Sequence, residues 1–416
     1  MVLRARGRSK LKTASAGVSG RILGGSGAKS PAMRGSILLR TMELRELPTP
    51  ALVLDRGRME RNAERLRRRL EAGGVPLRIH VKTAKSVEAV RHVLGGRTAP
   101  IAVSTLLEAE QFHAAGFRDL LYAVGLAPNR FERVAQLTRA GARVTVLLDG
   151  LELAREWRRF CRERALEVPT LVEVDTDGKR AGVRPEGAEL LELAEELSSG
   201  GLFGGLLTHA GGSYGSRSPE DLRRFARAER EGILVAAHRL RGQGLPVPTV
   251  SVGSTPTALF SESYADVTEV RAGVFLFMDL VMAGLGVCRL EDLALSVLTS
   301  VIGHSADRTR LFVDAGWTAL SRDRGTAPQA FDQGYGLLCD VLGRPLEDLV
   351  VSDTHQEHGT ISARPAAWLD TERFPAGTLL RILPNHACAT AAQHGAYHLV
   401  DGSERVLGRW ERFQGW

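Results

Sequence analysis

The chain has 416 residues, of which 44% are hydrophobic and 25% charged, so it is long enough for two domains with sizeable cores. These fractions exclude a collagen-like, coiled-coil or wholly disordered protein. The sequence contains no run of 18 apolar residues that would predict a membrane span. Its four cysteines are far apart, which argues against a disulfide scaffold, and we expect a cytoplasmic protein.

The net charge of +7 originates in the N-terminal tail. Residues 1–41 contain nine Lys or Arg and no acidic residue, which leaves 46 basic and 48 acidic residues for the rest. Because that remainder is near neutral and has no basic stripe interleaved with aromatics, we do not expect nucleic-acid binding. We expect residues 1–41 to be a disordered basic extension. It is either a transit peptide or an extension translated from an upstream start codon, in which case Met42 would be the first residue of the folded protein.

Apolar runs alternate with helical stretches from residue 48 onward. A short strand at 52–54 is followed by a charged amphipathic helix at 59–72. Eight further strands are predicted at 77–81, 100–104, 120–124, 144–148, 171–174, 202–207, 249–252 and 270–277. Helices are predicted between them at 106–115, 130–140, 151–166, 188–197 and 219–240. Eight such units predict an α/β fold with a TIM-type (β/α)8 barrel over 42–290, and an open doubly wound sheet is the alternative.

The pattern changes after residue 290. Five predicted strands follow with few helices between them, at 293–303, 310–315, 348–352, 378–383 and 397–400. We therefore expect a second, β-rich domain at 291–416. The segment 42–56 precedes the first full βα unit and could pair with that domain.

Lysine is rare enough to be informative. The chain has six lysines against 49 arginines, and only Lys82, Lys85 and Lys179 lie outside the tail. Lysine can act as an amine nucleophile, whereas arginine stays protonated. Lys82 ends the first barrel strand, and barrel enzymes carry their catalytic groups at the carboxyl ends of strands. Lys82 is therefore the candidate catalytic residue, whereas Lys85 is expected to be a solvated charge.

Two further motifs have the composition of binding sites. Gly253, Ser254 and Thr255 follow the seventh strand, where a Gly-Ser-Thr turn can bind a phosphate. His386 and Cys388 would point to one side of a strand and could bind one metal ion, although buried core residues are the alternative. His355 and His358 could assist them or could simply form a turn.

Nine short motifs, in order along the chain, resemble the fold-type III pyridoxal-phosphate enzymes of the D-serine dehydratase and D-threonine aldolase group. The resemblance runs from about Leu47 to Trp416 and implies an alanine-racemase-like barrel with a C-terminal β-rich domain. The motifs are Thr49-Pro50-Ala51, His80-Val81-Lys82-Thr83, Asp175-Thr176-Asp177-Gly178-Lys179-Arg180, Thr208-His209-Ala210-Gly211, Ser251-Val252-Gly253-Ser254-Thr255-Pro256, Glu269-Val270-Arg271-Ala272-Gly273, Val313-Asp314-Ala315-Gly316, Gln356-Glu357-His358-Gly359 and Pro384-Asn385-His386-Ala387-Cys388.

The resemblance also implies site residues. Lys82 would hold pyridoxal 5'-phosphate as a Schiff base, and His386 and Cys388 would bind a divalent metal. Thiolate and imidazole favour zinc, with manganese, cobalt or magnesium as alternatives. The other residues expected at the cofactor are Arg180 near the pyridine nitrogen, His209, Tyr214, Gly253, Ser254 and Thr255.

The metal motif separates the members of the group. The aldolases carry His-x-Asp, whereas this chain has His386-Ala387-Cys388, as the dehydratases do. The resemblance is greatest to the D-threo-3-hydroxyaspartate dehydratase branch. It implies a lyase that converts 3-hydroxy D-amino acids to an oxo acid and ammonia, acts on small molecules and forms a homodimer. A D-threonine aldolase, an amino-acid racemase and a non-catalytic protein of pyridoxal-phosphate homeostasis are the alternatives.

Overall fold

The computed structural model describes residues 42–416, so the expectation of a disordered extension at 1–41 lies outside the described residues. Eight parallel strands, β2 to β9, close into a barrel, and β9 pairs back onto β2 with Leu77 opposite Val270. The predicted (β/α)8 barrel is therefore confirmed and the open doubly wound sheet is wrong. The barrel strands are β2 (Leu77–His80), β3 (Ile101–Val103), β4 (Asp119–Gly125), β5 (Arg143–Leu148), β6 (Thr170–Val174), β7 (Phe203–Thr208), β8 (Thr249–Val252) and β9 (Glu269–Ala272).

Helices connect the barrel strands, and polar residues cap several of them. The side chains of Asp55, Ser86, Thr105 and Ser218 accept a hydrogen bond from a first-turn amide, which fixes where each helix starts. The helices are α1 (Arg56–Ala72), α2 (Val87–Val93), α3 (Leu106–Ala114), α4 (Phe131–Arg139), α5 (Leu151–Glu163), α6 (Ala188–Ser199), α7 (Pro219–Gly242), α8 (Thr255–Phe260) and α9 (Leu280–Gly284).

A mainly antiparallel sheet of nine strands forms the second domain, in the order β11-β14-β13-β12-β15-β10-β1-β16-β17. Its strand β1 (Ala51–Asp55) comes from the N-terminal side of the barrel and lies between β10 and β16. The other strands are β10 (Leu295–His304), β11 (Arg310–Val313), β12 (Gly336–Cys339), β13 (Pro345–Thr354), β14 (Gly359–Ala363), β15 (Leu379–Pro384), β16 (Ala396–Val400) and β17 (Gly408–Glu411). Two short helices, α10 (Trp317–Leu320) and α11 (Ala387–Ala391), complete the domain.

The strand predicted at 270–277 is wrong in its second half. β9 ends at Ala272, and residues Val274–Leu276 form a 3₁₀ helix instead. Gly273 allows the change of direction, because a Cβ there would lie 2.7 Å from the carbonyl oxygen of His80. The apolar run in the sequence continues past β9 because Phe275 and Phe277 are fully buried outside the barrel. The prediction was too long because an apolar run does not by itself distinguish a buried strand from a buried helix.

The barrel interior has layers that leave space only at one end. At the amino ends of the strands, Arg78 forms ion pairs of 2.7 Å with both Asp119 and Glu269. Above them an apolar layer fills the interior, made of Ala102, Leu121, Leu147, Leu171 and Leu207. The next inward positions, at the carboxyl ends, carry polar side chains and line a cavity.

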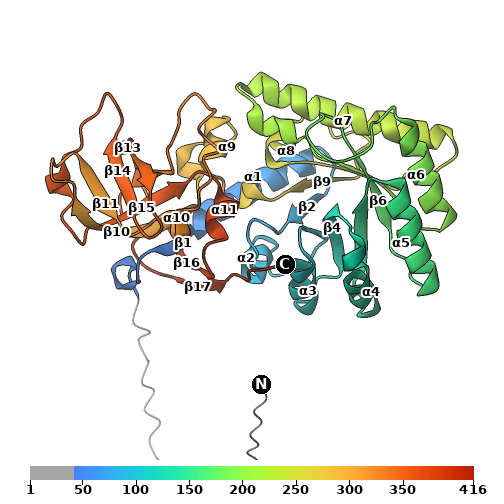
Figure 1. Ribbon diagram of the computed structural model, residues 1–416, viewed down its shortest axis with the longest axis horizontal. Coiled ribbons are helices and arrows are strands. Elements are labelled where there is room, and N and C mark those ends of the chain that lie inside the picture. The colour runs from blue at the N-terminus through green and yellow to red at the C-terminus, as the bar shows by residue number, and fades with distance from the viewer. Residues whose placement is uncertain (1–41) are drawn as a thin grey trace, which may run out of the picture. The chain divides into compact units, whose positions relative to one another are not determined.

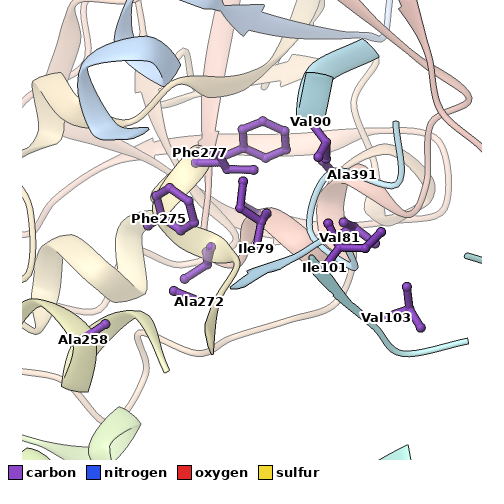
Figure 2. Packing of buried hydrophobic residues seen from close by; sticks show 14 of the residues in the cluster. Ile79, Val81, Val90, Ile101, Val103, Ala258, Ala272, Phe275, Phe277 and Ala391 are labelled. Carbon is purple, nitrogen blue, oxygen red and sulfur yellow. The ribbon is translucent and has the colours of Figure 1, made fainter. Parts of the chain in front are cut away.

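The outer faces of the same strands build the core that joins the barrel to the β-rich domain. Ile79, Val81 and Ile101 belong to one buried cluster with Val90 of α2 and Ala391 of α11, as Figure 2 shows from close by. Figure 1 shows β1 and α1 joining the two parts. This packing brings the loops of the β-rich domain against the carboxyl ends of the barrel strands. Among the helices of residues 42–416, none is long and apolar enough to cross a membrane.

Candidate active site

A cavity of about 430 Å³ lies at the carboxyl ends of the barrel strands and is closed on one side by the β-rich domain. The structure brings to its wall all nine residues that the sequence analysis expects to bind the cofactor or the metal. They are Lys82, Arg180, His209, Tyr214, Gly253, Ser254, Thr255, His386 and Cys388. These residues come from four barrel loops, after β2, β6, β7 and β8, and from the start of α11, far apart in sequence.

Lys82 lies two residues after the end of β2 and lines the cavity. Its amine has no hydrogen bond or ion pair to any residue of the described chain. His80 lies two residues earlier on the same inward face, and its buried Nδ1 also has no partner. Burial, together with the Lys82 ammonium, holds the pKa of His80 well below its usual value, so this imidazole is neutral.

The Gly-Ser-Thr turn joins β8 to α8. Gly253 has a φ of 131°, and a Cβ there would lie 2.2 Å from the carbonyl oxygen of Arg271, so only glycine fits. Ser254 caps α8, and its Oγ accepts a hydrogen bond from the Thr257 amide. His209 donates from Nδ1 to the Gly253 carbonyl at 2.8 Å. Burial, helped by Arg180, lowers the pKa of His209 to about 3, so its Nε2 is an acceptor.

Arg180 and Tyr214 lie on neighbouring loops. Arg180 follows β6, and no described side chain pairs with its guanidinium. Its Nε lies 3.3 Å from the position that a Cβ on Gly211 would occupy, at the start of the 3₁₀ helix Gly211–Gly215 that carries Tyr214. The ring centroid of Tyr214 is 6.3 Å from that of His209.

Sequence reasoning missed two charged residues on the cavity floor. The side-chain carboxyl of Glu173, in β6, has no hydrogen bond to a described residue, and burial, with repulsion from Asp149, raises its pKa to about 7. Arg271 of β9 is buried and donates at 2.5 Å both to Ser251 Oγ and to the Thr208 carbonyl. The signal that could have found both is a charged residue at an inward position of an otherwise apolar strand.

The His-x-Cys pair lies together, although the predicted strand geometry is wrong. β15 ends at Pro384, and His386 precedes α11, whose first turn contains Cys388. The imidazole and the thiol are within hydrogen-bonding reach of each other. Cys388 Sγ also lies 3.2 Å from Thr83 Oγ1.

Asp323 is a third residue at this pair that sequence reasoning did not single out. Its Oδ2 lies 2.8 Å from Nδ1 of His386. Burial lowers the pKa of His386, but Asp323 and Cys388 outweigh it and raise the pKa to about 11. Burial disfavours the Cys388 thiolate, yet the hydrogen bond from His386 lowers its pKa overall. Residues 42–416 contain no group of three or more His, Cys, Asp or Glu side chains arranged to hold a metal, so protein ligands alone would leave open positions.

Three candidates of lower rank lie elsewhere. His355 and His358 stack with ring centroids 4.6 Å apart in the turn between β13 and β14, and neither lines the cavity. Lys85 was expected to be solvated, which is wrong. Its side chain is 14% exposed and pairs with the fully buried Glu108 at 3.3 Å.

Comparison with known proteins gives two family matches and several full-length relatives. The model of the alanine racemase N-terminal domain matches residues 54–281, and that of a putative serine dehydratase domain matches residues 294–400. D-threo-3-hydroxyaspartate dehydratase of Delftia sp. (strain HT23) is 50% identical over 376 residues, covering 89% of this chain and 98% of that protein. D-serine dehydratase of Dictyostelium discoideum is 28% identical, covering 90% and 98%.

Solved structures agree with the sequence matches. The structure of the Delftia dehydratase is 48% identical, with a TM-score of 0.87, and covers 90% of this chain and 100% of that chain. A variant of the same enzyme with a cysteine replaced by alanine, described as the metal-free form, also has a TM-score of 0.87 at 48% identity and the same coverage. The chain therefore belongs to the fold-type III, pyridoxal-phosphate-dependent family that contains the D-threo-3-hydroxyaspartate and D-serine dehydratases.

Proposed function

We propose that the protein is a metal-dependent dehydratase of 3-hydroxy D-amino acids. Its substrates would be D-threo-3-hydroxyaspartate, giving oxaloacetate and ammonia, D-serine, giving pyruvate and ammonia, or both. The observation that carries the proposal is that the unpaired amine of Lys82 and the His386–Cys388 pair line one cavity. The identity to the Delftia dehydratase, which extends over nearly the whole of both chains, supports it.

The residues at the cavity fit a phosphate-bearing aldehyde cofactor. Lys82 and Arg180 have no anionic partner among the described residues, and the buried Nδ1 of His80 has none either. An anionic ligand would pair with the two exposed cations and could also give the buried Nδ1 of His80 a partner, which a buried polar atom otherwise lacks at a cost in free energy. Ser254 and Thr255 would bind the phosphate, and Lys82 would hold the cofactor covalently. When bound, pyridoxal phosphate withdraws electrons from the Cα of the amino acid.

Arg180 and Lys82 would then have distinct tasks. Arg180 would face the ring nitrogen, and its permanent positive charge would prevent that nitrogen from taking a proton. Arg180 would thereby limit the electron withdrawal available at the site, so loss of the Cα proton would need to be coupled to departure of the 3-hydroxyl group. Lys82 would take the Cα proton of the substrate as the general base.

The opposite wall would assist the leaving group. His386 and Cys388 offer an imidazole and a thiolate, a donor set that fits zinc and also accepts manganese or cobalt, with magnesium the least favoured. A divalent ion bound there supplies Lewis acidity to the 3-hydroxyl group. Asp323 would hold the imidazole by its Nδ1 and direct Nε2 toward the ion. Loss of water from C2 and C3 leaves an enamine, which hydrolyses to the oxo acid and ammonia.

A panel of D-amino acids tests the proposal. D-threo-3-hydroxyaspartate, D-serine and D-threonine are each incubated with the enzyme, with and without a chelator, and the products are assayed as oxo acid, ammonia and aldehyde. Oxo acid and ammonia in equal amounts, abolished by the chelator and restored by zinc or manganese, are expected. Glycine with glyoxylate or acetaldehyde would identify an aldolase, and chelator-resistant racemisation would identify a racemase.

A homodimer is part of the same proposal. The family resemblance supports it, and light scattering of the purified protein tests it. A mass of one chain at micromolar concentration would contradict it.

A further inference from the structure

The loop that carries Lys82 is held from outside the barrel. This loop, residues 81–86, runs from β2 to α2. The hydroxyl of Tyr397, in β16, donates to the Ala84 carbonyl at 2.6 Å. The amide of Phe413, beyond β17, donates to the Lys85 carbonyl at 3.0 Å. Two consecutive carbonyls of the loop therefore depend on donors from the β-rich domain.

Lys85 makes the same connection with its side chain. Its Nζ donates to the Gly415 carbonyl at 3.1 Å and pairs with Glu108 of α3 at 3.3 Å. Glu108 is fully buried, and its other oxygen accepts from the Ser104 amide at 2.6 Å. One ammonium group thus joins the Lys82 loop, α3 and the C-terminal segment.

The backbone of Lys85 itself has an unfavourable conformation, which these contacts maintain. Its φ is 41°, in the left-handed region that residues with a side chain rarely adopt. Such a conformation persists only where surrounding contacts maintain it. Here one contact is within the loop, where the Lys85 amide donates to the Val81 carbonyl at 2.8 Å. The others come from outside it, from the Phe413 amide, the Gly415 carbonyl and Glu108.

The C-terminal segment is itself anchored on α3. The rings of Phe413 and Phe112 meet edge to face with centroids 5.8 Å apart. Gly415 packs near Leu107, whose Cδ2 lies 3.4 Å from the position of a Cβ on that glycine. Figure 1 shows the C-terminus beside α2 and α3.

We propose that residues 413–415 form a strap on the Lys82 loop and that Lys85 is a positioning residue through which the strap acts. The strap fixes the backbone three residues after Lys82 and so fixes the direction in which the Lys82 amine enters the cavity. This inference rests on the proposed function only in taking Lys82 as the residue that bears the cofactor.

Three variants separate the strap from general stability. Deleting residues 413–416 removes the Phe413 and Gly415 contacts and leaves the Lys85–Glu108 pair. Lys85→Met combined with Glu108→Gln removes the ammonium without leaving a buried unpaired carboxylate. Arg409→Met is the matched control. It removes a cation from the same end of the chain, but Arg409 and its partner Glu411 are both exposed.

Hydrogen exchange of the full-length protein as purified is the first measurement. The peptide that covers residues 81–90 should exchange about tenfold faster in both strap variants, the factor expected for loss of one charge-assisted hydrogen bond. Arg409→Met should leave that peptide unchanged. Unchanged exchange in both strap variants would overturn the proposal, whether or not the protein proves to be a dehydratase.

Kinetics then distinguish positioning from simple support. In the strap variants kcat should fall about tenfold with KM little changed, and Lys85→Arg should recover most of the loss because it keeps a cation between Glu108 and Gly415. The bound cofactor should also dissociate faster, as followed by its visible absorbance. Faster exchange with wild-type kcat and cofactor retention would contradict the positioning role. A wild-type protein that binds no cofactor would instead contradict the proposed function, while the exchange result would still stand.

Discussion

Asp323 Oδ2 lies 2.8 Å from Nδ1 of His386, so a carboxylate from the loop after α10 fixes the imidazole next to Cys388. Carboxylates in this position orient a metal-binding histidine and increase its basicity. The hydrogen bond also commits Nδ1, which leaves Nε2 for an ion. The pair is therefore expected to matter most for metal affinity.

Asp323→Asn should weaken metal binding by about 10–100-fold, the usual effect of removing such a partner. The measurement is titration of the chelator-treated protein with zinc and manganese, followed by metal analysis after dialysis. Asp307→Asn, in an exposed turn away from the cavity, is the control. Wild-type affinity in Asp323→Asn would mean that the carboxylate does not support a metal ligand.

Cys388 provides the second test of the metal site. Cys388→Ala should abolish elimination while the absorbance of the bound cofactor remains, since the ion acts on the 3-hydroxyl group. Cys388→Asp exchanges a soft ligand for a hard one and should retain some activity, with a preference shifted from zinc toward manganese or magnesium. Cys339→Ala is the control, because that thiol is buried in the β-rich domain. Chelator-resistant turnover of the wild type would make His386 and Cys388 core residues and would favour a racemase.

Much of the barrel could be predicted from the sequence, because each strand is an apolar run bounded by a helix start. The position of Lys82 at the cavity could be predicted for the same reason, because Lys82 comes just after the end of β2. β12, β14 and β17 were missed because they are only four or five residues long and each begins at a glycine. The contact between Asp323 and His386 and that between Lys85 and Gly415 join residues 63 and 330 positions apart. Local patterns cannot reveal such pairs, because tertiary packing alone brings them together.

Lys82→Ala should remove the visible absorbance of the covalently held cofactor and reduce turnover by about 10²–10⁴-fold, the range for loss of a general base. Borohydride reduction of the wild type, followed by peptide mapping, should place the label on Lys82. Lys179→Ala is the control, because Lys179 is exposed in the loop after β6. A label on Lys85 or Lys179, or full absorbance in Lys82→Ala, would refute the assignment.

Glu173 should make the stability of the cofactor-free protein depend on pH. Burial and repulsion from Asp149 raise its pKa from 4.5 to about 7. A carboxyl whose pKa is raised in the folded state contributes its full stability below its unfolded value, and that contribution is lost as the pH rises through about 7. Because part of the side chain faces the solvent-filled cavity, the screened effect is about 1–2 kcal/mol.

Glu173→Gln keeps the size of the side chain and removes its ionisation. The variant should match the wild type at pH 4, below the unfolded pKa of 4.5, and unfold at a higher temperature than the wild type at pH 8, as measured by thermal denaturation of cofactor-free protein across that range. Glu167→Gln, an exposed residue just before the same strand, should follow the wild type at every pH. Equal melting temperatures of Glu173→Gln and the wild type at pH 8 would show that the Glu173 carboxylate ionises without cost. Arg271 and Arg180, which favour the charged form, would then outweigh burial on the cavity floor.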